Sequence, residues 1–96
     1  MTYEEKIWAK ITDVFLDIDL TANEKIVTLA LIWLCHHNKS IDIRAPRHYL
    51  SQVTSLSKKT TIRATQSLVL KDLLKVKNSY EEDGAFSANI YSIELD

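Results

Sequence analysis

The 96-residue sequence predicts a mainly helical α+β domain with a small β-hairpin, in the order helix, helix, strand, helix, helix, strand, strand. Two Thr-x-x-Glu capping boxes each precede apolar residues at helical spacing. Two β-rich runs near the end flank the turn pair Asp83-Gly84. A chain of this length can enclose one apolar core, so residues 1–96 are predicted to form a single domain.

The first helix is predicted over 3–18. Thr2 is its N-cap, and Glu5 completes the capping box. Helical spacing then predicts an inward stripe of Ile7, Ile11, Val14, Phe15 and Ile18.

The second helix starts at another capping box, formed by Thr21 and Glu24, with Leu20 placed before the cap as a hydrophobic staple. The segment "IVTLALIWL" within it is apolar nearly all round. We therefore expect this helix to be the central element of the core.

A short strand and a short third helix are predicted next. In "KSIDIRAP", isoleucines alternate with charged residues as in a strand, and the run ends at the only proline. Pro46 suits the first turn of the helix "PRHYLSQV", in which the residues expected to face inward are Tyr49, Leu50 and Val53.

The fourth helix is predicted over 58–71, after a tight connection at 54–56, with Ser57 as its N-cap. Ala64, Leu68 and Thr61 are expected to face inward. The runs "LLKVKNSY" and "NIYSIEL" then form the hairpin, and period two predicts that Leu74 shares a face with Val76, and Tyr91 with Ile93 and Leu95.

The charges are distributed unevenly, although the net charge is only −1. Residues 1–24 carry two basic and six acidic side chains, 25–80 carry ten basic and two acidic, and 81–96 carry five acidic and none basic. A basic middle between acidic ends is typical of a surface that binds a polyanion, and chance clustering in a short chain is the alternative.

Several other classes of function are disfavoured. No apolar run approaches the roughly 20 residues of a membrane span, no secretory signal is visible, and the one cysteine forms no internal disulfide, so a cytoplasmic protein is expected. Cys35, His36 and His37 are adjacent rather than three or four residues apart, which argues against a shared metal. No phosphate-binding glycine loop is present. The sequence predicts neither an enzyme nor a cofactor.

The stretch "LSQVTSLSKKTTIRATQSLVLKDLLKV" resembles winged helix-turn-helix domains of MarR-type regulators and the N-terminal domains of phage and plasmid replication initiators. The residues that match the family pattern are Leu50, Leu56, Ser57, Lys58, Lys59, Thr60, Arg63, Leu68, Leu73 and Leu74, and the likeness spans about Leu20 to Leu95. The departures from it are Thr61 in place of valine, Ser55 and Asp72 in place of glycine, and Glu81, Glu82 and Asp83 at the wing tip where basic residues are usual.

The resemblance implies sequence-specific binding of double-stranded DNA, with helix 58–71 in the major groove. Arg63 and Gln66 are residue types that read guanine and adenine edges, and Ile62 suits a thymine methyl group. The basic, hydroxyl-rich start of this helix suits a phosphate, and the start of the third helix suits the DNA backbone. The predicted DNA-binding residues are Arg47, His48, Ser57, Lys58, Lys59, Thr60, Ile62, Arg63 and Gln66.

Several alternatives remain open. Flanking phosphate contacts are one interpretation of Arg44, Lys71, Lys75 and Lys77, and a solvated-surface role fits each of them at least as well. The apolar stripe of helix 3–18, widened by Trp8, suits either the protein's own core or a homodimer. The expected role is that of a small transcriptional regulator or an accessory replication protein of phage or plasmid type. The rival is a protein–protein interaction module that uses the acidic hairpin and the first helix without binding DNA.

Overall fold

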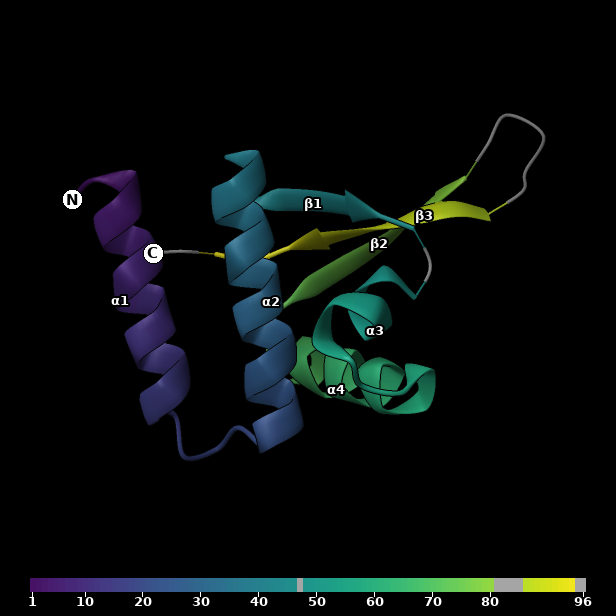
Figure 1. Ribbon diagram of the computed structural model, residues 1–96, viewed down its shortest axis with the longest axis horizontal. Coiled ribbons are helices and arrows are strands. Elements are labelled where there is room, and N and C mark those ends of the chain that lie inside the picture. The colour runs from purple at the N-terminus through teal and green to yellow at the C-terminus, as the bar shows by residue number, and fades with distance from the viewer. Residues whose placement is uncertain (47, 81–85, 95–96) are drawn as a thin grey trace.

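Both predicted capping boxes are present in the computed structural model of the protein, which describes residues 1–46, 48–80 and 86–94. Thr2 and Thr21 each accept a hydrogen bond from the backbone N–H of the glutamate three residues later, at 3.2 Å in both cases. They begin α1 (Tyr3–Leu16) and α2 (Ala22–Asn38), which run antiparallel and side by side (Figure 1). The remaining elements are β1 (Asp42–Ala45), α3 (Tyr49–Thr54), α4 (Lys58–Leu70), β2 (Lys75–Tyr80) and β3 (Phe86–Ser92).

The protein is therefore mainly helical with a small antiparallel sheet, which confirms the predicted α+β class. The three strands lie in the order β1-β3-β2, so the last strand of the chain is the central one. Ile43 pairs with Tyr91 on one side of it, and Val76 pairs with Tyr91 on the other. Among the described residues, no helix is long and apolar enough to cross a membrane.

The second helix is the centre of the core, as predicted. Figure 1 shows α2 standing between α1 and the rest of the fold, with α3 and α4 beneath the sheet. Its side chains Val27, Leu31, Ile32 and Cys35 are almost fully buried, and they meet Leu50 of α3 and Leu68 of α4. Burial raises the pKa of the Cys35 thiol to about 11, and the charge of Asp42 adds to this rise. At neutral pH Cys35 is therefore an inert thiol.

The predicted inward stripe of the first helix is wrong at its C-terminal end. Ile7 and Val14 are buried and Ile11 packs against the core, but Phe15 is 59% exposed and Ile18 is 93% exposed. The helix ends at Leu16 rather than at residue 18. The Asp17 carboxylate accepts a hydrogen bond from the backbone N–H of Asp19, which favours a turn over another helical residue.

The third helix starts later than predicted. Pro46 lies outside it, and His48 precedes it with a left-handed backbone at φ 67°. The helix is therefore only six residues long. Leu50 is buried and Tyr49 packs against the core, but Val53 is exposed, contrary to the prediction.

The hairpin confirms part of its predicted pattern. Tyr91 and Ile93 are buried, and so is Leu74, which precedes β2. Val76 is exposed and does not share the burial of Leu74. Leu95, the turn pair Asp83-Gly84 and the acidic residues Glu81 and Glu82 lie outside the described residues.

Candidate nucleic-acid interface

The connection between α3 and α4 is only three residues long and is fixed by two hydroxyl groups. Ser51 Oγ donates to the Leu56 carbonyl at 2.7 Å, and Thr54 Oγ1 accepts from the Leu56 N–H at 3.3 Å. Ser55 adopts a left-handed backbone with φ 62°. The side chain of Leu56 thereby packs against the core, so the two helices are held at a set angle.

Ser57 caps the N-terminus of α4, as predicted. Its Oγ accepts a hydrogen bond from the Thr60 N–H at 3.1 Å and donates one to Thr60 Oγ1 at 2.8 Å. The Ser57 hydroxyl hydrogen is thus used inside the helix, whereas Thr60 accepts this bond and keeps its own hydroxyl hydrogen for an outside acceptor. Of the two predicted phosphate donors, the geometry favours Thr60 and gives Ser57 a capping role.

The inward face of α4 is the predicted one. Ala64 and Leu68 are buried, and Thr61 is buried although it carries a hydroxyl. Thr61 Oγ1 donates to the Ser57 carbonyl at 2.9 Å, which satisfies this hydroxyl within the helix. No buried side-chain nitrogen or oxygen of the described residues lacks a hydrogen-bond partner.

The opposite face of α4 is open to solvent. Lys59, Ile62, Arg63 and Gln66 are all exposed, and we call these four residues the outward stripe. Lys58 is exposed beside them at the start of the helix. The amphipathic character predicted for this segment is therefore confirmed, with its cationic side chains on the side away from the core.

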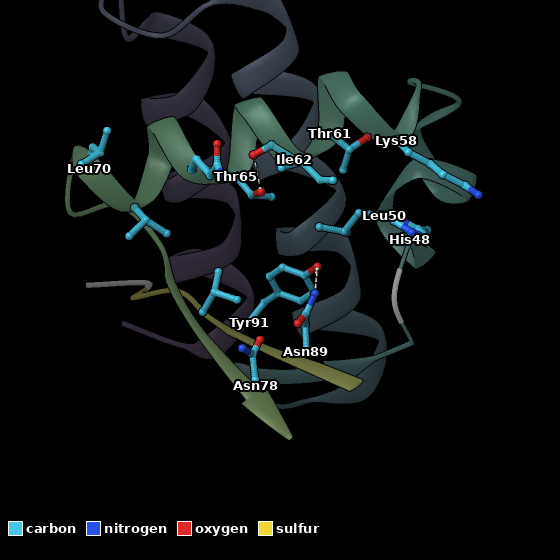
Figure 2. A pocket seen from close by; sticks show the side chains of 13 residues that line it. His48, Leu50, Lys58, Thr61, Ile62, Thr65, Leu70, Asn78, Asn89 and Tyr91 are labelled. Atoms are coloured by element: carbon cyan, nitrogen blue, oxygen red, sulfur yellow. Dashed lines mark hydrogen bonds between the residues drawn. The ribbon is translucent and has the colours of Figure 1, made fainter. Parts of the chain in front are cut away.

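A groove of about 690 Å³ runs between α4 and the β-sheet, and we call it the α4–sheet groove. Figure 2 shows Ile62 and Thr65 of α4 on one side and the sheet residue Tyr91 on the other, with Lys58 at one end and Leu70 at the opposite end. The complete lining consists of His48, Leu50, Lys58, Thr61, Ile62, Thr65, Gln66, Val69, Leu70, Val76, Asn78, Asn89 and Tyr91.

The sheet wall of this groove was not singled out by the sequence analysis. Asn78 pairs with Asn89 across β2 and β3, and Asn89 Nδ2 donates to Tyr91 Oη at 3.0 Å. Period-two alternation indicates that Val76 and Asn78 share a face of β2, but only the strand register brings that face against α4.

The two predicted residues at the start of the third helix have different outcomes. His48 is half-buried and lines the end of the α4–sheet groove that also contains Lys58. Arg47 lies outside the described residues. Of these two residues, the structure therefore places only His48, beside Lys58 at one end of the groove.

The cations of the basic middle segment are divided between two surfaces. Lys75 pairs with Ser92, and Lys77 and Arg44 both pair with Ile90, so these three basic residues belong to the face of the sheet opposite Tyr91 and Asn89. The α4–sheet groove lies on the Tyr91 face. Lys75, Lys77 and Arg44 are therefore placed away from the outward stripe, which limits their use as flanking contacts to it.

Lys71 has a structural partner. Its Nζ donates to Glu24 Oε2 at 2.9 Å and to the Asp19 carbonyl at 2.7 Å. Neither a phosphate contact nor a plain solvated surface describes Lys71, because its ammonium group is bound to Glu24 and to the Asp19 carbonyl.

His36 and His37 are exposed at the end of α2, where each stacks on an aromatic ring: His36 on Tyr3 and His37 on Trp33. Within residues 1–46, 48–80 and 86–94, no group of three or more His, Cys, Asp or Glu residues is arranged to hold a metal ion.

A comparison of this chain with protein-family models, with curated protein sequences and with solved structures finds no match.

Proposed function

We propose that the protein is a winged helix-turn-helix domain that binds double-stranded DNA with α4 in the major groove. In this role it serves as a small transcriptional regulator or as an accessory replication protein of phage or plasmid type. The observation that carries the proposal is the two-sided character of α4. Thr61, Ala64 and Leu68 anchor the helix to the core, while the outward stripe and Lys58 stay exposed.

The dimensions of α4 suit this role. A helix with its side chains is about 10–12 Å across, which matches a major groove about 12 Å wide. The 13 residues of α4 extend for about 20 Å at 1.5 Å per residue. Its N-terminal half can therefore meet base edges while its C-terminal half stays attached to α2.

Three residues of the outward stripe suit contacts to three different bases: guanine, adenine and thymine. Arg63 has the fork of donors that binds the O6 and N7 atoms of guanine, and the Gln66 amide matches the N6 and N7 atoms of adenine. Ile62, which is exposed, presents an apolar surface to a thymine methyl group. Together these three residues would read a short segment of one half-site.

The start of α4 would position the protein on the phosphate backbone. Its unpaired backbone N–H groups and the positive end of the helix dipole favour an anion. Lys58 and Lys59 add charge at the same end, and the Thr60 hydroxyl adds a donor. His48 lies beside Lys58 at the mouth of the groove, where it would meet the same strand.

A pair of double variants with equal charge change tests this proposal. Lys59→Ala with Arg63→Ala removes two cations from α4, and Lys75→Ala with Lys77→Ala removes two from the opposite face of the sheet. We expect the first double variant to lower affinity for duplex DNA and to reduce the slope of log affinity against log salt by about 1, because the Lys59 contact to phosphate contributes about 0.9 and Arg63 contacts a base. The sheet variant should keep an affinity close to that of the wild type.

Fluorescence polarisation with a labelled duplex, at three or more salt concentrations, provides the measurement. An equal loss in both double variants would show attraction by net charge alone and would contradict the assignment of α4. Wild-type binding left unchanged by the α4 variant would contradict it as well.

The second candidate is a protein–protein interaction module that uses the acidic hairpin and the first helix, without DNA. It is favoured by the Trp8 ring of α1, which is 67% exposed on a helix with α2 as its neighbour. Random duplex at low salt separates the two candidates. A DNA-binding domain should bind it with a dissociation constant of about 100 µM or lower, because low salt strengthens nonspecific binding, and a lack of binding at that concentration favours the interaction module.

A further inference from the structure

The helix pair α1 and α2 exposes an apolar face that the DNA-binding proposal leaves unused. Trp8 and Phe15 stand seven residues apart on α1, and Ile26, Leu29 and Trp33 follow helical spacing on α2. Both tryptophans of the chain belong to this set, and they are 67% and 51% exposed. We call these five residues the α1–α2 face.

The α1–α2 face is hollow at one end and carries the exposed Phe15 ring at the other. A cavity of about 430 Å³ lies between the helices, where Trp8 and Ile11 meet Leu29 and Trp33. At the other end, Lys25 Nζ donates to the Phe15 carbonyl at 2.9 Å, which sets Phe15 level with the start of α2. The face therefore combines a hollow with exposed aromatic rings, which is typical of a surface that binds another protein.

We propose that this face binds a second copy of the chain in a two-fold symmetric dimer, with the four helices of the two α1–α2 pairs packed together. The exposed area agrees with such an interface. At about 200 Å² for a whole aromatic side chain, the rings of Trp8, Phe15 and Trp33 expose about 350 Å² per copy. Stable dimers bury about 800 Å² per partner, of which the apolar centre is roughly half.

Charge and apolar pairing select the arrangement of the two copies. Glu4 of α1 and His36 of α2 line the same end of the cavity, level with Trp8 and Trp33. When α1 of each copy lies across α2 of the other, the Glu4 carboxylate meets the partner's His36 ring, whose N–H can donate to it. The same arrangement sets Trp8 against the partner's Trp33 and Phe15 against the partner's Ile26.

The dimer uses residues other than those of the candidate DNA surface. The α1–α2 face and the outward stripe share no residue, and Figure 1 shows α1 separated from α4 by α2. The inference goes beyond the proposed function, because association through this face requires no nucleic acid. It is measured on the protein alone, so its failure and the failure of DNA binding are separate results.

Sedimentation and tryptophan fluorescence of the wild-type chain test the dimer from about 100 µM down to about 0.1 µM. We expect a dimer that dissociates on dilution. The tryptophan emission should shift to the red at the same protein concentration, because dissociation exposes both indole rings to water. A monomer over the whole range overturns the proposal and leaves the face to a different protein. A dimer that dissociates with no change in emission also overturns it, because its interface then lies elsewhere.

Three variants locate the interface. Trp8→Glu and Trp33→Glu change exposed positions, so far-UV circular dichroism should match the wild type, and each should be monomeric at about 100 µM. Leu70→Glu is the matched control, since Leu70 is 86% exposed on α4, and it should remain dimeric. Dissociation by Leu70→Glu, or dimers in both tryptophan variants, would contradict the assignment.

A charge exchange tests the arrangement. Glu4→Lys should weaken the dimer at least several-fold, and adding His36→Glu should restore it by recreating an attractive pair between copies. If the double variant dissociates further than Glu4→Lys alone, α1 does not lie across the partner's α2, and the proposed arrangement is wrong.

Discussion

Lys71, the residue after the last turn of α4, donates a hydrogen bond of 2.9 Å from Nζ to Oε2 of Glu24 in the first turn of α2. Ser67 Oγ donates to the same oxygen at 3.0 Å, and the Thr21 N–H donates to the other one at 3.0 Å. The Glu24 residue is only 3% exposed. The capping carboxylate of one helix therefore also fixes the end of another, and it sets the position of α4 on the core.

We predict that Lys71→Ala destabilises the protein by about 1–3 kcal/mol. Removing one partner of a buried ion pair leaves the other charge uncompensated, and the cost falls below that of a fully buried pair because the Lys71 side chain is 35% exposed. Urea unfolding of both proteins measures the difference. Lys75→Ala, which removes an exposed lysine, should change the free energy of unfolding by no more than about 0.5 kcal/mol.

The pH dependence of stability should report the same carboxylate. Burial on its own would raise the pKa of Glu24, but hydrogen bonds from Lys71, Thr21 and Ser67 outweigh it and lower the pKa from 4.5 to about 2. Because the folded-state pKa lies below the unfolded one, the stabilisation is complete above pH 4.5 and is lost as the pH falls towards 2. We expect a loss of about 3 kcal/mol across this window.

Chemical unfolding at a series of pH values from about 5 to about 2 provides the test of that window. Glu24→Gln should remove most of the pH dependence there, at the cost of a lower stability at neutral pH. If the wild type and Glu24→Gln lose stability in parallel on acidification, another carboxylate controls the acid transition.

Thr61→Val should leave the fold intact and raise stability by up to about 1 kcal/mol. The Ser57 carbonyl that accepts the Thr61 hydroxyl also accepts the Thr61 backbone N–H at 2.9 Å, so it keeps a partner when the hydroxyl is lost. A buried methyl group then replaces a buried polar one at nearly equal volume. Thermal unfolding of Thr61→Val and Thr61→Ser gives the comparison, and a Thr61→Val protein less stable than Thr61→Ser would show that the hydroxyl is required.

Ser55 occupies a position whose backbone favours glycine, with φ 62° between α3 and α4. We expect Ser55→Gly to be neutral or to stabilise by up to about 1 kcal/mol, since relief of the left-handed backbone offsets the greater freedom of glycine in the unfolded chain. Ser55→Val, with a branched β-carbon, should destabilise by about 1–2 kcal/mol. Equal stability of the glycine and valine variants would contradict the left-handed conformation.

Local features were predictable from the sequence because their partners lie within four residues. The capping boxes at Thr2 and Thr21 and the Ser57 cap are all present. Asp72, which stands where the family pattern has glycine, has the left-handed backbone that glycine favours, at φ 59°. The inward face of α4 followed from its own period. Each of these depends on the backbone of one helix and its immediate ends.

The apolar spacing wrongly predicted burial of Phe15, Ile18 and Val53. Spacing shows which side of a helix is apolar, but it does not show how far the neighbouring helices and strands cover that side. α1 packs against α2 through Ile7 and Val14, which belong to the core. After Leu16 the helix ends and the chain turns away. Exposure at that end depends on the neighbouring elements rather than on the helix itself.

The sequence by itself determined the helices, their caps and the cationic outer side of α4, since all of these are set by contacts between residues close in the chain. Only the tertiary structure decided which charges act together. Strand register placed Lys75 and Lys77 on the sheet face away from α4, and packing of α4 on α2 engaged Lys71 with Glu24, 47 positions away. Electrostatic partnership depends on distance in space, and for residues this far apart in the chain that distance is set by how the helices and strands pack.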